Sequence, residues 1–321
     1  MKRIASRIAA FAAGVAVAGA AWAQAYPAKP VRIIVAYQAG QGTDVATRHF
    51  ADQLTKALGQ SFFVENRPGA GGNIGTDVTA KSPPDGYTLT MGTAATHAMN
   101  QFMYQSLPFD GEKDFEPIIL TGMLPMVISA HPSFPANTIE ELIAAAKAKP
   151  DSINVAMPST TARIVYELLK QRTGAPLFGV AYKGSATAMT ETIGGQVPLT
   201  IDTVTASRPQ VTSGKLKALA ITTLKTSELL PGVKSVAEQG VPGFEVTAWN
   251  ALYAPRGTPK AIVDQLNAEM RKIIAQPETR QRLLALGFEP AGGSAQQLAE
   301  FGRAERQKWG QLIRSAGIRA D

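Results

Sequence analysis

The sequence predicts an α/β fold in which helices cover mostly parallel sheets. Residues 31–37 (VRIIVAY) form a continuous apolar and β-branched run with one arginine, which is typical of a buried parallel strand. Further short apolar runs alternate with segments whose apolar residues recur at helical spacing. Recognisable helix-capping residues lie between them. Regular alternation of strand and helix is the pattern of layered α/β proteins.

The elements follow in order along the chain. After the first strand, Ala46, Phe50, Leu54, Ala57 and Leu58 fall on one face of a helix. Further strands are predicted at residues 61–65, 88–91, 126–130, 153–157, 177–181 and 216–222. Helix starts are predicted at Thr138 with Glu141, at Ser294 with Gln297, and at Thr258 ahead of Pro259.

The first 25 residues have the pattern of a secretory signal peptide. Lys2, Arg3 and Arg7 form a basic start, residues 8–20 carry no charge, and residues 21–25 offer alternating alanines for cleavage. A membrane anchor is the alternative, but the apolar run is shorter than the roughly 20 residues that span a bilayer. No cysteine follows, so we expect no lipid anchor. We predict a cleaved signal at residues 1–25 and a periplasmic mature protein.

Composition restricts the function further. The chain has no cysteine, which excludes disulfides, thiolate nucleophiles and thiolate metal sites. Without the three basic residues of the signal, 29 Lys and Arg face 25 Asp and Glu, a net charge of +4 with no basic run. This balance argues against nucleic acid as a partner and mildly favours anionic ligands. Nucleotide cofactors are not expected in the periplasm, so we predict no cofactor.

Several short stretches resemble one receptor family. They are residues 26–32 (YPAKPVR), 39–44 (AGQGTD) with Arg48, 65–75 (ENRPGAGGNIG) and 85–89 (DGYTL). Residues 182–184 (YKG), 194–197 (GGQV), 254–259 (APRGTP) and 286–290 (LGFEP) extend the set over nearly the whole mature chain. Together they resemble the Bug family, the periplasmic receptors of tripartite tricarboxylate transporters.

The resemblance implies a two-lobed periplasmic-binding-protein type II fold, each lobe a mostly parallel sheet flanked by helices, with a hinged cleft between them. We expect lobe one to comprise residues 26–124 and 224–321, and lobe two residues 125–223. The resemblance also implies capture of a small carboxylate, with a dicarboxylate or an aromatic acid favoured. The expected partners are the large and small membrane subunits of such a transporter, and the receptor itself is expected to be a monomer.

Ligand contacts are expected in the loops that follow strands, because ligands bind outside the carboxyl ends of open parallel sheets. The first such loop contains Tyr37, Gln38, Gly40, Gly42 and Thr43. Its glycines and the following helix N-terminus offer backbone N–H groups to an anion. Alternatively, the glycines only make the turn and the threonine only caps the helix. The resemblance favours ligand contact.

Asp44 in this loop has two interpretations. Its carboxylate either pairs with Arg48 one turn on, which we favour, or receives a ligand ammonium group. The glycines also mimic a dinucleotide-binding fingerprint, but Val45 occupies the place of the third glycine. We therefore expect no nucleotide at this loop.

The second predicted loop, residues 157–163 (MPSTTAR), belongs to lobe two. The Bug family usually has more glycines here and a histidine where this chain has Arg163. Ser159, Thr160 and Thr161 can donate hydroxyls, and Arg163 can hold a carboxylate through two N–H groups. An arginine that extends to solvent or pairs with Glu167 is a nearly equal alternative.

The remaining cleft candidates are spread over both predicted lobes. Thr93, Ala94 and His97 follow a strand of lobe one, while Tyr182 and Asp202 belong to lobe two. The histidines at 49, 97 and 131 are too far apart in sequence to suggest a metal site, so we predict no metal.

No catalytic residues are predicted. The chain lacks a G-x-S-x-G nucleophile elbow and an H-E-x-x-H zinc motif, and it has no cysteine. The resemblance to the Bug family implies a receptor that returns its ligand unchanged, and this is the predicted function. A periplasmic ligand sensor is a close alternative, and a hydrolase assembled from distant residues is a remote one.

Overall fold

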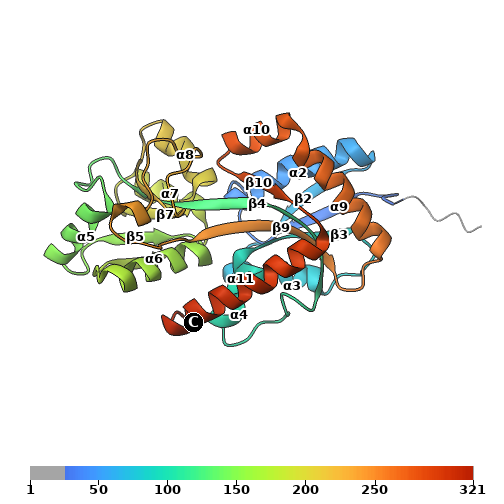
Figure 1. The fold of residues 1–321 in the computed structure, drawn as a ribbon, viewed down its shortest axis with the longest axis horizontal. Helices are drawn as coiled ribbons and strands as arrows, with labels where there is room; N and C mark the ends of the chain where they lie inside the picture. The colour runs from blue at the N-terminus through green and yellow to red at the C-terminus, as the bar shows by residue number, and fades with distance from the viewer. Residues whose placement is uncertain (1–25, 321) are drawn as a thin grey trace, which may run out of the picture.

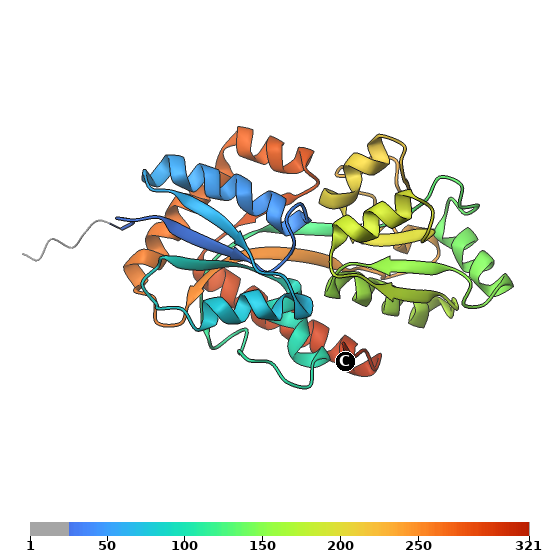
Figure 2. The same cartoon turned by 180° about the vertical axis from the view of Figure 1, so that it is seen from behind.

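The structure, a computed structural model, describes residues 26–320. It confirms the predicted α/β architecture, with helices packed around two sheets that lie end to end (Figure 1). The same two parts are seen from behind in Figure 2. We call the part around the first sheet lobe one and the part around the second sheet lobe two. The predicted signal peptide lies outside the described residues.

The sheet of lobe one contains three parallel strands and a set of antiparallel ones. Strand β1 (Val31–Val35) lies between β2 (Phe62–Asn66) and β3 (Thr88–Thr93), parallel to both. Strand β9 (Thr247–Pro255) runs antiparallel to β3 and to the first half of β4 (Phe115–Ala130). A short β10 (Glu289–Gly292) completes this sheet against β4.

The sheet of lobe two begins on the second half of β4. Strand β7 (Leu199–Thr203) pairs antiparallel with β4, and β5 (Asn154–Met157) lies parallel to β7. Strand β6 (Phe178–Ala181) is parallel to β5, and β8 (Lys217–Ile221) returns antiparallel to β4. The parallel strands of both sheets lead into loops that meet between the lobes, where a ligand site is expected.

Helices cover both sheets. Around lobe one they are α2 (Gly42–Leu58), α3 (Asn73–Ala80), α4 (Asn100–Met103), α9 (Lys260–Ala275), α10 (Pro277–Ala285) and α11 (Ala295–Ser315). Around lobe two they are α5 (Ile139–Ala148), α6 (Thr160–Thr173), α7 (Ser185–Ile193) and α8 (Val204–Thr212). Short turns η1 (Ala70–Gly72), η2 (Ala95–Met99) and η3 (Ala237–Gln239) complete the elements.

Two long strands connect the lobes. Strand β4 takes part in both sheets, and β9 pairs with it from Phe115 opposite Pro255 to Pro125 opposite Thr247. The sequence predicts only residues 126–130 of β4 and does not predict β9. Pro117 and Gly122 lie near the two register shifts in this pairing, and such residues obscure a strand pattern in the sequence.

The predicted helix caps have different outcomes. The Thr138 side chain accepts the Glu141 N–H at the start of α5, and Ser294 with Gln297 forms a complete capping box on α11. The prediction for Thr258 is wrong, because its hydroxyl donates instead to the Pro255 carbonyl at 2.8 Å. Helix α9 therefore begins one residue later than predicted, at Lys260.

The division into lobes at residue 223 stays a prediction, and the contacts of the following segment suggest a later boundary. Gln239 accepts the Ile139 N–H and donates to the Leu219 carbonyl, so it is held by elements of lobe two. The Val246 N–H donates to the Thr222 carbonyl at the foot of β9. We propose that lobe two extends to about residue 246.

Candidate functional site

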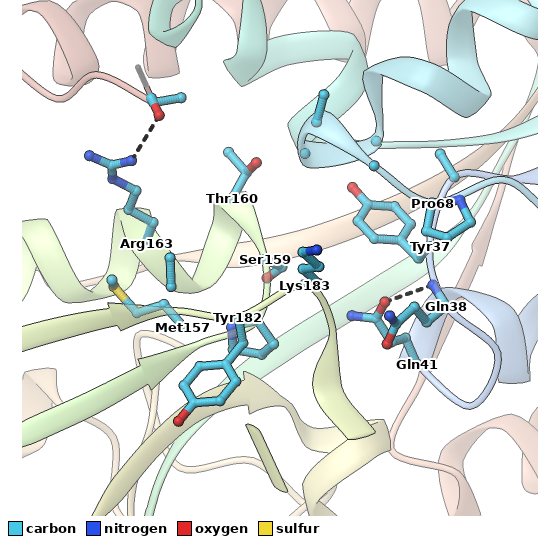
Figure 3. A pocket seen from close by; sticks show the side chains of 18 of the residues that line it. Tyr37, Gln38, Gln41, Pro68, Met157, Ser159, Thr160, Arg163, Tyr182 and Lys183 are labelled. Carbon is cyan, nitrogen blue, oxygen red and sulfur yellow. Dashed lines mark hydrogen bonds between the residues drawn. The ribbon is translucent and has the colours of Figure 1, made fainter. Parts of the chain in front are cut away.

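A cavity of about 500 Å³ lies between the two lobes. The loops after β1 and β2, helix α4, the start of α6 and the loop after β6 contribute its walls (Figure 3). The residues that line it are Ala36, Tyr37, Gln38, Gln41, Pro68, Gly69, Ala70, Gly71, Gly72, Met103, Tyr104, Met157, Pro158, Ser159, Thr160, Arg163, Ala181, Tyr182, Lys183 and Ala320. Because both lobes contribute, a ligand here would bridge them.

The structure brings ten of the predicted site residues to this region. Tyr37, Gln38, Ser159, Thr160, Arg163 and Tyr182 line the main cavity. An adjacent cavity of about 30 Å³, enough for one water molecule, is lined by Tyr37, Gly42, Thr43, Thr93, Ser159 and Asp202 among others. Gly40, Asp44, Ala94 and His97 line neither cavity.

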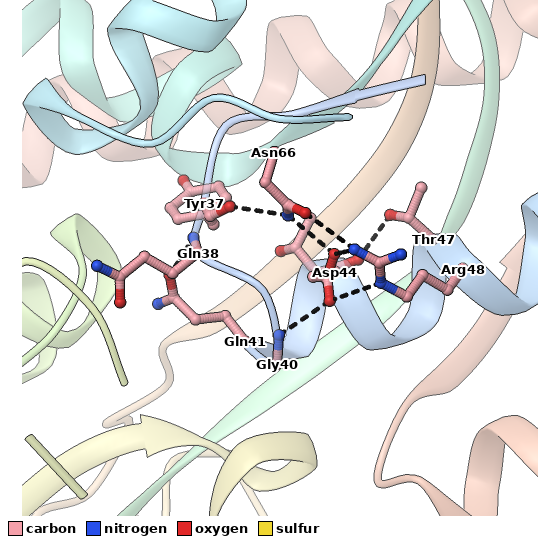
Figure 4. Close-up of polar contacts among 9 residues, drawn as sticks. Tyr37, Gln38, Gly40, Gln41, Asp44, Thr47, Arg48 and Asn66 are labelled. Carbon is pink, nitrogen blue, oxygen red and sulfur yellow. Dashed lines mark hydrogen bonds and ion pairs between the residues drawn. The ribbon is translucent and has the colours of Figure 1, made fainter. Parts of the chain in front are cut away.

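The loop after β1 is held by its own side chains (Figure 4). Gly40 has φ 84°, a conformation that glycine adopts without strain. The Gln41 side-chain oxygen accepts the Gln38 N–H at 2.9 Å, and the Asp44 carboxylate accepts the Gly40 N–H at 2.9 Å. The Gly40 N–H is therefore already bonded within the loop and is not available to a ligand.

Asp44 has the internal role that we favoured. Its carboxylate is 2% exposed and lies 3.0 Å from Nη2 of Arg48, with a second contact from Nε. Asn66 donates to it at 2.8 Å from the end of β2. These bonds fasten the first turn of α2 to the neighbouring strand (Figure 4).

Gly42 lies at a close contact between the two lobes. A Cβ atom at this position would lie 2.6 Å from Oγ1 of Thr203 and 3.2 Å from Cβ of Thr205, both in lobe two. The start of α2 thus faces the turn between β7 and α8 and not the main cavity. Thr43 donates to the Asn250 side chain at 3.1 Å, which also occupies its hydroxyl within the protein.

The start of α6 presents hydroxyl groups to the main cavity. The Ser159 hydroxyl accepts the Ala162 N–H at 3.2 Å as the helix cap, which leaves its own hydrogen free to donate. Across the cleft, a Cβ at Gly71 would lie 2.8 Å from Oγ1 of Thr160 and 2.5 Å from the Tyr104 hydroxyl oxygen. Only glycine at residue 71 leaves room for these side chains to approach the η1 loop.

Arg163 lies at one end of the cavity (Figure 3). Its Nη1 donates to the Ala320 carbonyl at 3.3 Å. Its Nε is buried, lies 3.9 Å from the Glu167 carboxylate and makes no hydrogen bond within the described residues. The predicted contact with Glu167 is therefore a loose ion pair, and it coexists with a position in the cavity wall.

The charge of the cavity is positive. Its lining residues include the cationic side chains of Arg163 and Lys183 and no Asp or Glu. Gln38, Gln41, Ser159 and Thr160 add neutral polar groups, and Met157, Pro158 and Pro68 add apolar surface. Such a mixture of apolar walls and a few polar anchors is typical of a small-molecule site.

Two tyrosines in the wall are neutral hydrogen-bonding groups. The Tyr37 hydroxyl lies 2.9 Å from the Thr93 hydroxyl, and burial raises its pKa to about 12. The Tyr182 hydroxyl donates to Glu191 of α7; loss of hydration and then this carboxylate raise the pKa of Tyr182 to about 12. Both therefore stay protonated at physiological pH.

Asp202 occupies the small cavity with Asn250. The backbone N–H of Thr203 donates to its Oδ1 at 2.7 Å, while its Oδ2 and the Asn250 side-chain nitrogen have no hydrogen-bond partner within residues 26–320. Burial raises the pKa of Asp202 to about 6. The buried carboxyl group lies beside the main cavity and does not line it.

His97 is a core residue and not part of the cleft wall. Its ring is 1% exposed and stacks on Tyr253, with centroids 4.1 Å apart. Burial lowers the pKa of His97 to about 3, so the ring is neutral. The reason is the π-helical turn η2, which directs the chain after β3 beneath α11, where Arg306 donates to the His97 carbonyl. Ala94 is likewise fully buried.

Several cavity residues were not predicted. The segment from Pro68 to Gly72 belongs to a stretch that resembles the Bug family, and its position directly after β2 also marks it as a cleft loop. Gln41 lies inside the first predicted cleft loop, and Lys183 directly follows the predicted cleft residue Tyr182. Met103, Tyr104 and Ala320 carry no such signal, because packing of α4 and α11 brings them to the cleft.

Comparison with known proteins decides the family. A sequence profile described as "Tripartite tricarboxylate transporter family receptor" matches residues 46–318. The chain belongs to this receptor family. Protein BugT of Bordetella pertussis is 34% identical over 322 residues, covering 99% of both chains. A protein encoded in the tcbD–tcbE intergenic region of Pseudomonas sp. strain P51 is 34% identical, covering 90% of this chain and 87% of that one. The resemblance to the Bug family is thus confirmed.

Solved structures of this receptor family share the fold. Rpa4515 of R. palustris, solved with adipate, has a TM-score of 0.89 and 35% identity, covering 92% of this chain and 99% of that one. The periplasmic binding protein BugD has a TM-score of 0.86 and 35% identity, with coverage of 92% and 99%. MatC of Rhodopseudomonas palustris, with bound malate, has a TM-score of 0.84 and 31% identity, with coverage of 90% and 100%.

The family is one of periplasmic solute receptors and not of enzymes. Within residues 26–320, no group of three or more His, Cys, Asp or Glu side chains is placed to hold a metal ion. No helix in the described part of the chain has the length and apolar character to cross a membrane.

Proposed function

We propose that this receptor captures a small carboxylate, with a dicarboxylate or an aromatic acid favoured, between its two lobes. The periplasm is the proposed compartment, and the large and small membrane subunits of a tripartite tricarboxylate transporter are the proposed recipients. The receptor is proposed to return its ligand chemically unchanged and to act without a cofactor.

One observation carries this proposal: the interlobe cavity has Arg163 and Lys183 in its wall and no carboxylate. An anion is therefore the ligand that this wall stabilises, because a cation would meet two like charges in a partly dehydrated space. The apolar surface of Met157, Pro158 and Pro68 suits the hydrocarbon part of an organic acid.

Polar side chains at both ends of the cavity favour an acid with two carboxylates. Arg163 lies at one end of the cavity, while Tyr37, Gln38 and Gln41 lie toward the other, with Ser159 and Thr160 between them (Figure 3). Relatives whose structures contain adipate and malate support the same class. The volume of about 500 Å³ admits acids of either size.

A thermal-shift screen followed by calorimetry tests the proposal. Succinate, malate, adipate, benzoate, citrate and aspartate would be compared on the mature protein. A ligand at a hundred times its Kd should stabilise the fold by about 2.7 kcal/mol. Adipate and its monoamide form the sharpest pair, since loss of one charge should weaken binding roughly tenfold or more. Equal affinity for both would contradict a two-carboxylate site.

Turnover separates the receptor from the hydrolase alternative. The bound acid, and a methyl ester of it, would be incubated with the protein and followed by NMR. Full recovery of both is the expected result. Transport is separated from sensing by uptake of labelled acid in cells that lack the receptor gene, where uptake should return only with the receptor and both membrane subunits present.

A further inference from the structure

We infer that Ala320, held by the short segment 317–320 that leaves α11, forms the end wall of the ligand cavity and holds Arg163 in position, so that it sets the ligand lengths that the receptor accepts. The inference rests on the proposed function, because it concerns the same cavity. Ala320 and Arg163 both line that cavity, one from the segment after α11 and the other from α6. A hydrogen bond from Nη1 of Arg163 to the Ala320 carbonyl, 3.3 Å long, joins them across the lobes.

The local sequence fixes the course of this segment. Helix α11 ends at Ser315, and Gly317 adopts φ 63°, where a glycine is unstrained. The Gly317 N–H donates to the Arg314 carbonyl at 3.3 Å, and the Ile318 N–H donates to the Ile313 carbonyl at 3.1 Å. These two bonds make a Schellman motif, so the chain leaves the helix in one defined direction.

The segment is then anchored to lobe one. Ile318 is 4% exposed and packs in the main core. Two residues later, the Ala320 N–H donates to the Met103 carbonyl at 3.0 Å. Met103 itself is 2% exposed and lines the cavity, so the anchor lies directly behind the cavity wall. The segment therefore belongs to lobe one, while Arg163 belongs to lobe two.

The hydrogen bond to the Ala320 carbonyl positions Arg163 and leaves other N–H groups of its guanidinium available. A guanidinium group carries five N–H donors in a rigid plane, and the Ala320 carbonyl accepts from one nitrogen. The Nε donor has no hydrogen-bond partner within the described residues, and Glu167 is 3.9 Å away. The arginine is thus oriented by a backbone carbonyl and keeps donors for a carboxylate, which matches the two-point geometry that arginine provides.

The Arg163–Ala320 hydrogen bond links the length of the ligand to the closure of the two lobes. Because the two partners lie on different lobes, the Arg163–Ala320 bond forms only when the cleft is closed. A ligand that ends short of the wall permits closure and meets a correctly placed guanidinium. A ligand that is too long must displace residues 317–320 and loses the bond. Removing the wall should therefore relax the length preference.

Calorimetry on a chain that stops after Ile318 tests this inference. The stop removes Ala320 but keeps the buried isoleucine, and the probes are succinate, adipate and suberate. We expect the ratio of the suberate Kd to the adipate Kd to fall by roughly fivefold or more relative to the full chain. Arg163→Ala should weaken adipate binding less in the shortened chain than in the full chain, because its position is already lost.

Two substitutions in the full chain sharpen the result. Ala320→Pro keeps the carbonyl but removes the N–H that bonds Met103, and it should shift the Kd ratio in the same direction as the shortened chain. Arg319→Ala is the matched control: Arg319 lines a separate surface depression with Phe102 and Arg314 and does not line the cavity, so the ratio should stay unchanged. The control also accounts for the Arg319 side chain that the shortened chain loses.

The experiment distinguishes failure of the inference about Ala320 from failure of the proposed function. If the full chain binds none of the dicarboxylates, the proposed function fails, and the inference that rests on it is overturned with it. If the full chain binds and both the shortened chain and Ala320→Pro keep its Kd ratio, the inference is overturned and the receptor proposal stands. If the shortened chain does not unfold cooperatively, the ratio measured for Ala320→Pro decides alone.

Discussion

The side-chain nitrogen of Gln41 in lobe one donates to the hydroxyl of Ser185 in lobe two, at 3.1 Å. Both residues are at least 94% buried, and Gln41 is fixed by the Gln38 N–H on its other side. A hydrogen bond between two buried side chains on separate lobes can exist only in the closed arrangement. It therefore stabilises closure independently of the ligand.

Ser185→Ala should shift the protein toward an open form and weaken ligand binding. The lost hydrogen bond is worth about 0.5–1.5 kcal/mol, which corresponds to a two- to tenfold rise in Kd. Gln41→Ala should have at least this effect, and the double variant should cost less than the sum. Calorimetry gives the Kd, and small-angle scattering gives the radius of gyration with and without ligand.

Thr190→Ala is the control for this pair. Its hydroxyl lies on the same helix but bonds the Ala186 carbonyl within α7, so neither affinity nor radius should change. Strictly additive effects of the Gln41 and Ser185 substitutions would show that the bond across the lobes contributes nothing to closure.

Arg163→Ala should weaken binding of a dicarboxylate by about ten- to a hundredfold. A charge-assisted hydrogen bond contributes roughly 1.5–3 kcal/mol, and the variant loses both the ligand contact and the Ala320 contact. Arg163→Lys should not fully restore affinity, because an ammonium group lacks the planar two-point geometry. The comparison is made by calorimetry with a dicarboxylate and its monoamide.

Arg172→Ala is the matched arginine on the same helix. It is exposed and donates to the Pro242 carbonyl at 3.4 Å, away from the cavity, so its loss should leave affinity unchanged. If Arg163→Ala also binds with native affinity and still prefers the dicarboxylate, ligand choice must depend on the loops of lobe one.

Arg48→Ala should lower stability and leave affinity nearly unchanged. It removes two contacts to the buried Asp44 carboxylate and one to Asn66, at a cost of about 1–3 kcal/mol. Urea denaturation measures the free energy of unfolding, and calorimetry measures the Kd. Lys56→Ala, which breaks an exposed pair with Asp52 on the same helix, should cost less than about 0.5 kcal/mol. A large loss of affinity without loss of stability would instead assign Arg48 to ligand binding.

Asp202 should make the fold less stable as pH rises from about 4 to 6. Burial raises the pKa of its carboxyl from 3.8 to about 6, and the Ser185 and Thr203 hydrogen bonds only partly offset this. Between these values the folded protein binds more protons than the unfolded chain, so the free energy of unfolding falls with rising pH. The full cost, of the order of 2–3 kcal/mol, is present above pH 6.

Asp202→Asn tests this by removing the ionisation. The variant should match the wild type near pH 4 and exceed it in urea denaturation at pH 7, since the amide never carries the buried charge. The difference between the two proteins isolates Asp202 from other titrating groups, including the buried His97, whose lowered pKa has the opposite effect on stability. Parallel pH profiles would show that Asp202 ionises without cost.

The sequence predicts a structural element correctly where a local residue pattern alone determines that element. The run at residues 31–37 predicts β1, and the capping pairs at Thr138 and Ser294 predict the starts of α5 and α11. The rule that ligands bind in loops after parallel strands points to Ser159, Thr160 and Arg163, which line the cavity; their contact with a ligand stays a prediction. These signals depend on neighbours within a few positions, which a single sequence displays.

Features that depend on distant packing were not predictable. Strand β9 has polar Asn250 and Thr247 among its residues, and its partners lie far away on β3 and β4. His97 follows a strand like a cleft residue, yet the π-helical turn carries it into the core. Gly42 was expected to approach a ligand, and its close neighbour is instead Thr203 of the opposite lobe.

The position of β9 in the sheet determines the order in which the two lobes can fold. β9 lies between β3 and β4 in the sheet of lobe one, although the whole of lobe two separates it from them in the chain. Until residues 247–255 are in place, β3 and the first half of β4 both present unpaired edges, and such edges favour association with other chains. The strands of lobe two can all pair before β9 is available, whereas the sheet of lobe one stays incomplete until β9 joins β3 to β4.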